Sequence, residues 1–397
     1  MAARGTIIST FSGGGGLDLG MECAGFDTLA CLDTELSARK TLKANRPDWF
    51  VPDDGDVSTA AQRLTPASVG LKPGDLDVLA GGPPCQPFSM AAQWTRTARL
   101  GMDDDRAQPV NGMLDLAASF LPRAIVIENV AGYLSGDNSA LKVIEARLKA
   151  INASTQSKYR LHWDVIDAAA YGVPQHRKRA IAVAFRDGRD MPMPAATHAD
   201  RPMTAWDALH DHKETAPPAS RGSWTPLLAS IPEGENYQWL TAKGGGPELF
   251  GWRTRYWSFL LKLAKNRPSW TLPASPGPNT GPFHWDNRPL SVRERLRLQS
   301  FPDSWALAGT ERERYVLAGN ATPPLLAEVI GRAVAEQLGI EGLPARPKLL
   351  RPRAEATPAA RKPKALPPRF VPLVGPRDAH PGAGQGPSPR VEEEPAA

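Results

Sequence analysis

The clearest candidate for chemistry is Cys85, which lies in the segment Gly-Gly-Pro-Pro-Cys-Gln-Pro-Phe-Ser at positions 81–89. A lone cysteine usually serves as a small buried apolar residue. Here the apolar run 76–80 predicts a strand that delivers the cysteine to the carboxyl edge of a sheet, where ligands bind in α/β folds. Because glycines and three prolines surround the thiol, we predict a stiff, accessible loop and a nucleophilic role. A free thiol titrates at about 8.5, so this role requires surroundings that stabilise the thiolate.

Two further groups suit acid–base and anion-binding chemistry. Glu128 follows the apolar run 124–127 and so belongs at the same sheet edge, although alone it would equally be an exposed acid at a strand end. Gln175, Arg177 and Arg179 are spaced by two, and in a strand all three would face one side. Taken alone, this basic segment would be interpreted as a run of charged side chains exposed to solvent.

A glycine-rich turn lies near the start of the chain. Residues 6–10 predict a buried strand that leads into Phe11, Ser12 and four glycines at 13–16, and a helix is expected over 17–24. Glycines at such a turn let a ligand approach the backbone closely. No Gly-Lys-Ser/Thr follows, which excludes a P-loop, and Asp18 occupies the third glycine position of the dinucleotide fingerprint.

Two acids strengthen the interpretation of this turn as a nucleotide site. Asp33 ends the predicted strand 26–32, where a carboxylate can bind both ribose hydroxyls of an adenosine. Asp56 is expected at the end of a further strand, within reach of an adenine amino group. Each acid alone would be a loop residue or a helix cap, but their order around one sheet edge favours a cofactor site.

The elements that must position these residues alternate between strand and helix, which predicts an α/β fold with a mostly parallel sheet. Further strands are expected at 76–80, 124–127 and 180–185, and Thr34 is expected to cap a helix that runs to Asn45. Ser291 and Glu294 form a capping-box pattern, and another helix is expected over 324–338.

Two parts of the chain lack this periodicity. Residues 186–310 are rich in Trp, Pro, Gly and Arg and predict a smaller, loop-rich domain. From position 344 to the end there are 13 prolines in 54 residues, with ten Lys/Arg and five Asp/Glu, and we expect a disordered tail. The tail alone accounts for the net charge of +5, so any nucleic-acid-binding charge elsewhere must be local.

Composition excludes several classes of protein. No apolar run is long enough for a membrane span, and no signal peptide is recognised. Three cysteines in 397 residues predict neither a disulfide framework nor a metal site, and we expect an intracellular, reducing compartment.

The motifs together resemble the DNA cytosine-5 methyltransferase family. The resemblance covers roughly residues 6–337 and lies in segments that occur in the family's order: Phe-x-Gly-x-Gly-Gly from Phe11, Pro84-Cys85-Gln86, Glu128-Asn129-Val130, Gln175-x-Arg177-x-Arg179, Arg288-Pro289-Leu290-Ser291 with Gln299-Ser300-Phe301-Pro302, and Gly319-Asn320-Ala321-Thr322-Pro323-Pro324.

This resemblance implies S-adenosylmethionine as the methyl donor and a covalent mechanism. Cys85 would add to carbon 6 of cytosine so that carbon 5 attacks the methyl group. Glu128 would be the proton donor to ring nitrogen 3. Arg179 would contact the cytosine carbonyl and the catalytic carboxylate, whereas Arg177 would brace the loop or a phosphate. The cofactor site would comprise Phe11, Ser12, Gly13, Gly15, Gly16, Leu17, Asp33, Thr34, Asp56, Val57, Pro84, Asn320 and Thr322.

The family architecture implies a Rossmann-like catalytic domain, residues 1–185 and 311–343, and a target-recognition domain, residues 186–310. The substrate would be double-stranded DNA from which one cytosine is flipped into the pocket. The mobile loop after Cys85 carries Arg96, Arg99 and Arg106, which would grip phosphates. Candidate DNA contacts are Gln86, Ser89, Trp252, Arg253, Arg255, Trp257, Lys262 and Thr271.

Three alternatives differ from this interpretation. A methyltransferase of the same fold acting on transfer RNA would carry a Cys-Phe-Thr tripeptide, which is absent here. A silent DNA-binding regulator would be expected to lose Cys85 or Glu128. An NAD-dependent enzyme would not explain the proline-flanked cysteine. We expect a bacterial, cytoplasmic, monomeric restriction–modification enzyme whose cognate endonuclease, where one exists, acts on the same DNA sequence without direct contact.

Overall fold

The computed structural model describes residues 4–84, 108–135, 139–253 and 256–377. Its centre is a six-stranded sheet in the order β2-β1-β3-β4-β6-β5. The strands are β1 (Gly5–Thr10), β2 (Phe26–Leu32), β3 (Val78–Gly81), β4 (Ala124–Val130), β5 (His162–Asp167) and β6 (Lys178–Phe185). Neighbours are parallel from β2 to β4, and β6 runs antiparallel to both β4 and β5. The predicted α/β fold with a mostly parallel sheet is confirmed.

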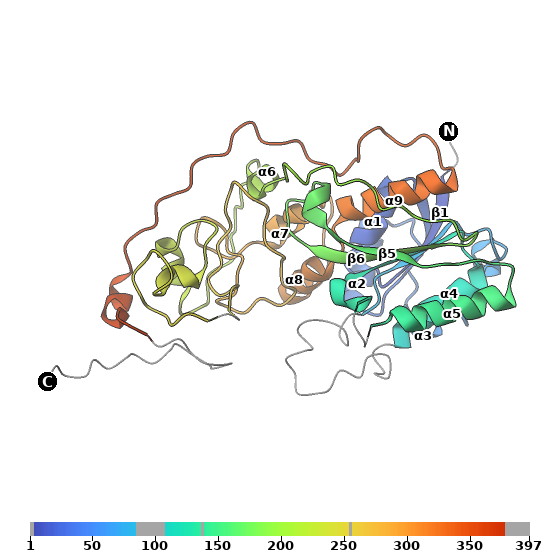
Figure 1. Cartoon of the computed structure of the whole chain (residues 1–397), viewed down its shortest axis with the longest axis horizontal. Helices are drawn as coiled ribbons and strands as arrows, with labels where there is room; N and C mark the ends of the chain where they lie inside the picture. The colour runs from blue at the N-terminus through green and yellow to red at the C-terminus, as the bar shows by residue number, and fades with distance from the viewer. Residues whose placement is uncertain (1–3, 85–107, 136–138, 254–255, 378–397) are drawn as a thin grey trace.

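Helices cover both faces of this sheet (Figure 1). The α-helices are α1 (Gly16–Cys23), α2 (Leu36–Asn45), α3 (Val57–Ala60), α4 (Gln108–Phe120), α5 (Leu141–Ser154), α6 (Ala205–Leu209), α7 (Val292–Leu298), α8 (Glu311–Asn320) and α9 (Pro324–Leu338). The short 3-10 helices are η1 (Ala67–Val69), η5 (Ala131–Tyr133), η6 (Ala168–Tyr171), η7 (Thr225–Ser230), η8 (Tyr237–Leu240) and η9 (Pro368–Leu373).

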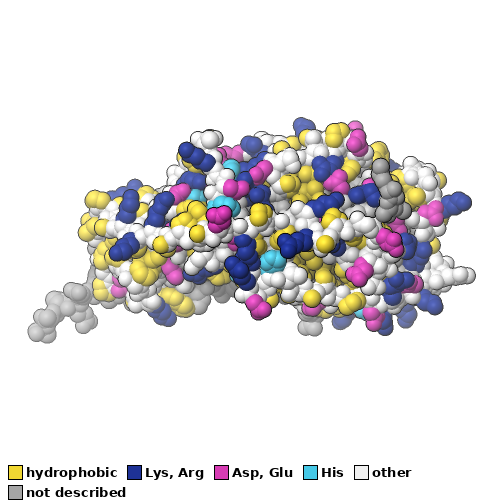
Figure 2. All heavy atoms as spheres, turned by 90° about the horizontal axis from the view of Figure 1, so that it is seen from above, with side chains coloured by type: hydrophobic (Ala, Val, Ile, Leu, Met, Phe, Trp, Pro, Cys, Tyr) yellow, Lys and Arg dark blue, Asp and Glu magenta, His cyan; other side chains and the backbone are white. Residues whose placement is uncertain are grey.

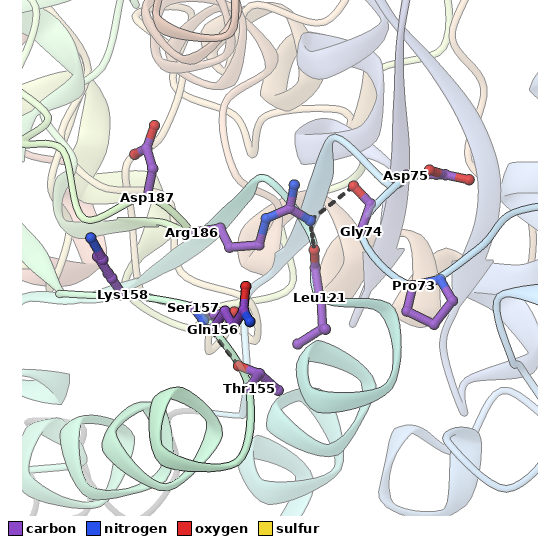
Figure 3. Close-up of a pocket in the computed structure, with 10 residues that line it drawn as sticks. All are labelled: Pro73, Gly74, Asp75, Leu121, Thr155, Gln156, Ser157, Lys158, Arg186 and Asp187. Carbon is purple, nitrogen blue, oxygen red and sulfur yellow. Dashed lines mark hydrogen bonds between the residues drawn. The ribbon is translucent and has the colours of Figure 1, made fainter.

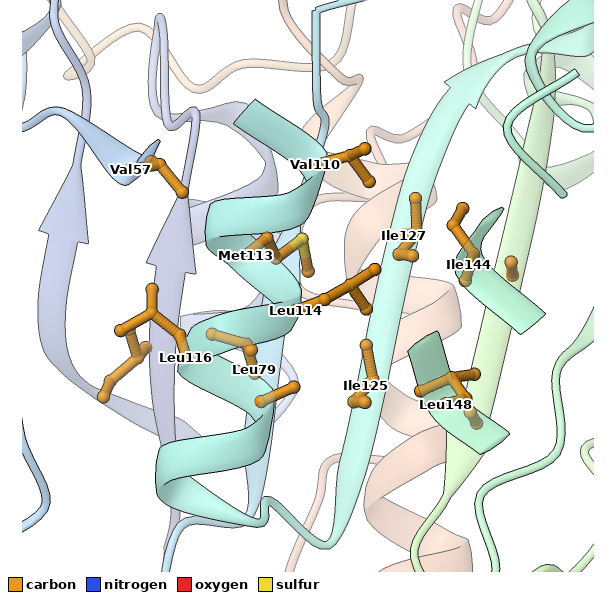
Figure 4. Close-up of a cluster of buried hydrophobic side chains, with 14 of the residues drawn as sticks. Val57, Leu79, Val110, Met113, Leu114, Leu116, Ile125, Ile127, Ile144 and Leu148 are labelled. Atoms are coloured by element: carbon orange, nitrogen blue, oxygen red, sulfur yellow. The ribbon is translucent and has the colours of Figure 1, made fainter. Parts of the chain in front are cut away.

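Alternation along each strand divides the core into two layers, because successive side chains point to opposite faces. Leu79, Ile125 and Ile127 pack under α4 and α5, as Figure 4 shows. Their neighbours Val78 and Val126 instead join α1 and α9 on the other face. The sheet is therefore buried on both sides, as a parallel sheet requires.

Glycine brings α1 against α9. A Cβ at Gly20 would lie 2.4 Å from both the carbonyl oxygen of Pro324 and the Cβ of Ala327. A Cβ at Gly16 would lie 2.0 Å from the carbonyl oxygen of Thr322. This close packing attaches the last helix of the domain to the glycine turn at its start.

Residues 186–290, which make up most of the predicted recognition domain 186–310 and are here called the recognition region, form mainly loops. Its regular elements are α6, η7 and η8, and a cluster of buried side chains that includes Leu227, Tyr237 and Phe250 forms its core. This small amount of regular structure agrees with the weak periodicity of the sequence there.

Three local expectations are wrong. No strand ends at Asp56, whose side chain instead caps α3 by accepting a hydrogen bond from the backbone N–H of Ser58 at 2.9 Å. The N-cap of α2 is Glu35 rather than Thr34, and no side chain caps it. Gln175 and Arg177 precede β6, so strand geometry does not determine the direction of their side chains.

The expected disorder of the tail is also wrong for residues 344–377. This segment follows the surface from the end of α9 to the far side of the recognition region (Figure 1), and it makes specific hydrogen bonds along its length. Its composition is misleading because most of these contacts use backbone groups and arginines rather than apolar side chains. Positions 378–397 lie outside the described residues.

Candidate active site

Glu128 lies in β4, and two residues distant in sequence hold its carboxylate. Nε of Arg179, on the neighbouring strand β6, is 2.8 Å from Oε1, and both side chains are almost fully buried. The hydroxyl of Thr322 donates to Oε2 at 3.0 Å. The resemblance predicted the pairing of Arg179 with the carboxylate. It assigned Thr322 to the cofactor, whereas in the structure the Thr322 hydroxyl contacts Glu128.

The chain that leads to Cys85 starts directly beside this carboxylate. A Cβ at Gly82 would lie 3.3 Å from both the carbonyl oxygen and Oε2 of Glu128, a tight contact that the glycine avoids. The side-chain amide of Asn129 donates to the carbonyl oxygen of Pro83 at 2.8 Å. Asn129 thus ties the loop to the end of β4. Pro84 is exposed, and the predicted residues Cys85, Gln86 and Ser89 lie outside the described residues.

Arg177 has a different position from Arg179. Its guanidinium is buried, and Nη2 donates to the carbonyl oxygens of Gly319 at 3.0 Å and Asn320 at 3.3 Å. Those residues end α8 and lead to Thr322. In this structure Arg177 therefore braces the segment that touches Glu128, in line with the bracing role that the resemblance implied.

The glycine turn is held by two acids, Asp33 directly after β2 and Asp18 in α1. Phe11, Gly13 and Gly15 all have positive φ angles, of 57°, 53° and 78°. The backbone N–H of Gly13 donates to Oδ2 of Asp33 at 2.7 Å, and the N–H of Glu35 donates to Oδ1 at 2.8 Å. Burial raises the pKa of Asp33, although these two hydrogen bonds lower it.

Asp18 stabilises this turn from inside the core, a role that its place in the sequence did not predict. It is fully buried, and Oδ1 accepts hydrogen bonds from Ser12 at 2.9 Å and from the thiol of Cys31 at 3.2 Å. Burial raises the pKa of Asp18. The acid therefore links the turn to β2.

The other predicted cofactor residues lie around the same turn. A Cβ at Gly55 would lie 2.1 Å from the carbonyl oxygen of Asp33, so Asp56 and Val57 follow a direct backbone contact with the end of β2. Leu17 is buried in the core under α9. The carbonyl oxygen of Thr34 accepts a hydrogen bond from Arg39 at 2.5 Å. The structure therefore gathers residues 11–17, 33–34 and 55–57 at one edge, with residues 320–322 packed against Gly16.

The recognition region meets this edge through Gln175, which is fully buried. Oε1 of Gln175 accepts the N–H of Leu272 at 3.1 Å, and the hydroxyl of Thr271 donates to the carbonyl oxygen of His176 at 2.7 Å. Arg295 of α7 donates to the carbonyl oxygen of Pro273. His176 therefore holds the predicted DNA-contact residue Thr271, and Gln175 holds the adjacent Leu272.

Two cations expected on the DNA-binding surface are buried. The guanidinium of Arg253 lies 5.6 Å from the centre of the Tyr256 ring. Nζ of Lys262 donates to the carbonyl oxygen of Leu228 at 2.8 Å and to Asn287 at 3.1 Å, and burial lowers the pKa of Lys262 to about 8. These side chains support the recognition region from inside. Arg255 lies outside the described residues.

Exposed aromatic rings occur beside Thr271. Trp257 and Trp270 are 45% and 37% exposed, and their rings meet edge to face with centroids 5.7 Å apart. The ring of Trp270 also lies 6.2 Å from that of His176. The aromatic pair thus adjoins the segment that holds Arg177 and Arg179.

A cavity of about 580 Å³ lies at the opposite end of the sheet (Figure 3). Arg186, which directly follows β6, donates there to the carbonyl oxygens of Gly74 and Leu121 at 2.8 and 2.5 Å. Since β6 is antiparallel, this end is remote from Glu128 and Arg179. The cavity is separate from the site.

Charged side chains of both signs lie on the visible surface of the molecule. On the face in Figure 2, Lys/Arg and Asp/Glu side chains are interspersed rather than segregated. Within the described ranges, no group of three His, Cys, Asp or Glu residues is arranged to hold a metal. No helix in that part of the chain is long and apolar enough to cross a membrane.

Comparison with known proteins agrees with this geometry. The family of C-5 cytosine-specific DNA methylases matches residues 5–336. The Type II methyltransferase M.SacI of Streptomyces achromogenes is 35% identical over 373 residues, covering 84% of this chain and 93% of that protein. M.Eco47II of Escherichia coli is 33% identical over 357 residues, covering 84% and 79%.

Solved structures share the fold. A DNA modification methyltransferase encoded within an E. coli prophage has a TM-score of 0.58 at 23% identity and covers 85% of this chain and 100% of that chain. The Dnmt2 methyltransferase of S. pombe has a TM-score of 0.54 at 17% identity, with coverage of 84% and 99%. The chain therefore belongs to the family of C-5 cytosine-specific DNA methylases, and it is a DNA cytosine-5 methyltransferase.

Proposed function

We propose that this enzyme transfers a methyl group from S-adenosylmethionine to carbon 5 of a cytosine flipped out of a short, specific double-stranded DNA sequence, through a covalent adduct with Cys85. The observation that carries the proposal is the position of Glu128. Its carboxylate is held by Arg179 and Thr322, directly beside the start of the Cys85 loop. A nucleophile and a positioned acid at one sheet edge are what addition to cytosine requires.

The residues around the glycine turn fit S-adenosylmethionine, which supplies an electrophilic methyl group. Three positive φ angles, at Phe11, Gly13 and Gly15, shape a turn whose backbone a ligand can approach. Asp33 ends β2 beside this turn, and Asp56 lies next to it through the contact at Gly55. In this proposal Asp33 binds ribose hydroxyls, Asp56 binds the adenine amino group, and residues 320–322 cover the ligand.

The chain's own residues would then act on the cytosine. The thiolate of Cys85 forms a bond to carbon 6, and Glu128 provides a proton at ring nitrogen 3 as negative charge develops there. Arg179 orients the carboxylate and binds the cytosine carbonyl oxygen. After carbon 5 has gained its methyl group, it loses its proton to water, elimination of the thiolate restores the carbon 5–carbon 6 double bond, and the proton on ring nitrogen 3 returns to Glu128.

The relatives, which are named Type II methyltransferases, support a proposal for the cellular role. We propose that this enzyme acts as a monomer in the bacterial cytoplasm and protects host DNA in a restriction–modification system. A cognate endonuclease would recognise the same sequence without contacting the methyltransferase.

Bisulfite sequencing of plasmid DNA from expressing cells tests the proposal. Wild-type enzyme should protect cytosines within one short sequence, and Cys85→Ser should protect none. Cys23→Ser is the matched control, because Cys23 is a free, partly buried cysteine on α1. Soluble wild-type protein that binds S-adenosylmethionine yet protects no cytosine would contradict the proposed DNA reaction, and protection by Cys85→Ser would contradict the nucleophile.

A further inference from the structure

The segment 344–377, here called the strap, crosses from the catalytic domain to the recognition region. It leaves the end of α9 and runs extended along one side of the molecule to η9 on the far side of the recognition region (Figure 1). Extended chain that lies on a surface loses conformational entropy, so its order requires compensating contacts along its path.

Carboxylates of the folded body accept backbone N–H groups of the strap. On α9, buried Glu328 accepts the N–H groups of Lys348 at 2.6 Å and Leu349 at 2.9 Å. Asp207 of α6 accepts the N–H of Ala354 at 2.9 Å. Further along, Glu233 accepts from Arg361 at 3.2 Å and Glu248 from Arg377 at 3.1 Å. Hydrogen bonds to charged acceptors are stronger than those between neutral groups.

Arginines of the strap bind carbonyl oxygens between these points. Arg351 donates to Phe301 at 3.2 Å, beyond α7, and Arg353 donates to Pro202 at 3.0 Å, before α6. Together with the carboxylate contacts, these bonds fix the strap to both parts of the molecule in succession.

The far end of the strap completes the core of the recognition region. The N–H of Lys364 donates to the carbonyl oxygen of Ala229 at 2.8 Å. Phe370 is 5% exposed, and its ring stacks on Trp224 with centroids 5.5 Å apart. Leu366 and Leu373 pack against the same cluster. A region with so little regular structure thus obtains part of its core from a segment more than 70 residues later in the chain.

We infer that the strap is a positioning element for DNA recognition. It holds the recognition region from the side of α9, whereas the contacts of Gln175 and Arg295 hold it at the active-site edge. Phe370 is the positioning residue that locks the far end. The inference goes beyond methyl transfer itself and rests on the proposed DNA substrate.

The first test uses the full-length chain with Phe370→Ala, and Val371→Ala as the control, because Val371 is the adjacent residue and is 55% exposed. Phe370→Ala should raise the KM for unmethylated plasmid DNA by about tenfold or more, with kcat within about threefold and the Kd for S-adenosylmethionine unchanged. Phe370→Leu, which keeps a buried apolar side chain, should largely restore KM. An unchanged KM in Phe370→Ala, or loss of S-adenosylmethionine binding along with DNA binding, would overturn the inference.

A second pair of variants leaves the core intact. Ala354→Pro removes the N–H that Asp207 accepts, whereas Ala359→Pro places the same ring in the exposed stretch between two contacts. Hydrogen exchange of residues 225–250 should accelerate in Ala354→Pro but not in Ala359→Pro, and β1 to β4 should be unaffected in both. Equal exchange in the two variants would also overturn the inference. Because exchange needs no DNA, faster exchange in Ala354→Pro together with a wild-type enzyme that methylates no DNA would count against the proposed function alone.

Discussion

At the scale of single residues, the carboxylate of Glu128 is held by groups from widely separated parts of the chain. Arg179 belongs to β6, and Thr322 lies 194 positions away, in the segment between α8 and α9. An ion pair and a hydroxyl on different oxygens fix the direction of the carboxylate before any substrate binds. Such preorganisation lowers the cost of reaching the transition state.

The first prediction concerns Glu128→Gln. The amide keeps the shape of the side chain but loses the ion pair with Arg179 and cannot deliver a proton. We expect kcat to fall by roughly 10²- to 10⁴-fold, the usual contribution of a general acid, while the Kd for S-adenosylmethionine is unchanged. Single-turnover methylation measures the effect. Glu145→Gln, an exposed position on α5, is the control, and a kcat of Glu128→Gln within threefold of wild type would contradict the assignment.

A second prediction concerns Trp257, whose exposed ring adjoins Trp270 and the segment of Thr271. We expect Trp257→Ala to weaken DNA binding about five- to 100-fold, since stacking on a base contributes roughly 1–3 kcal/mol. Fluorescence anisotropy with labelled duplex DNA measures this change. Val165→Ala, an exposed apolar position on β5, should bind normally, and equal affinity of both variants would remove Trp257 from the DNA interface.

At the scale of elements, the register of β4 and β6 decides which side chains meet. Val130 pairs with Arg179 and Glu128 with Ile181, so the arginine lies two residues beyond the acid and reaches back to it. On the other side, Arg177 connects the start of β6 to the end of α8. The junction of α8 and α9 is therefore held against the sheet edge that carries Glu128. There the hydroxyl of Thr322 contacts Glu128, and the carbonyl oxygen of Thr322 packs against Gly16.

This arrangement predicts the effect of Arg177→Lys. Lysine keeps the charge but lacks the planar guanidinium that reaches two carbonyl oxygens, so the Gly319–Asn320 segment should lose its brace. We expect the Kd for S-adenosylmethionine to rise by about tenfold, equivalent to about 1.4 kcal/mol, with a smaller change in kcat. Isothermal titration calorimetry checks it. The neighbouring exposed Lys178→Arg should behave as wild type, and unchanged binding in Arg177→Lys would show that the brace is dispensable.

At the scale of the whole molecule, the recognition region is held by its contacts with other parts of the chain rather than by long helices or sheets of its own. Buried polar groups inside it, such as Lys262 and His284, replace part of an apolar core. Nδ1 of His284 accepts the N–H of Asp286 at 3.1 Å, which requires that nitrogen to be unprotonated. Burial lowers the pKa of His284 to about 4.

The stability of the protein should therefore fall in weak acid. The unfolded imidazole binds a proton at a pKa near 6.5, whereas the folded one does so only near 4, so the stabilisation present above pH 6.5 is lost as the pH falls toward 4. We expect the free energy of unfolding to be lower at pH 5 than at pH 7.5 by on the order of 1–2 kcal/mol from this group. Urea denaturation at both pH values measures it.

His284→Gln should reduce that pH dependence, whereas His210→Gln should retain it, because His210 is exposed at the end of α6. The same pH dependence in all three proteins would show that other groups govern acid sensitivity.

The sequence by itself determined the core of the catalytic domain. Alternating apolar runs located five strands of the sheet, and the capping box at Ser291 and the start of the last helix at Pro324 were correct. These features are local, since side-chain periodicity and caps act over a few residues. Only the family resemblance predicted that Arg179 pairs with Glu128. The spacing of two residues between Arg177 and Arg179 shows that they can share a face, but it does not show which strand lies beside them.

Tertiary structure decided the contacts made through backbone groups and burial. Every residue offers a carbonyl oxygen and nearly every residue an N–H, so the brace of Arg177, the hold of Gln175 on Leu272 and the anchoring of the strap leave no pattern in the sequence. Burial likewise depends on what packs against a side chain, which is why Arg253 looked like a DNA contact and proved to be internal. A proline-rich tail looked disordered for the same reason: its contacts are supplied by carboxylates and carbonyls of distant elements, and only the folded chain brings them together.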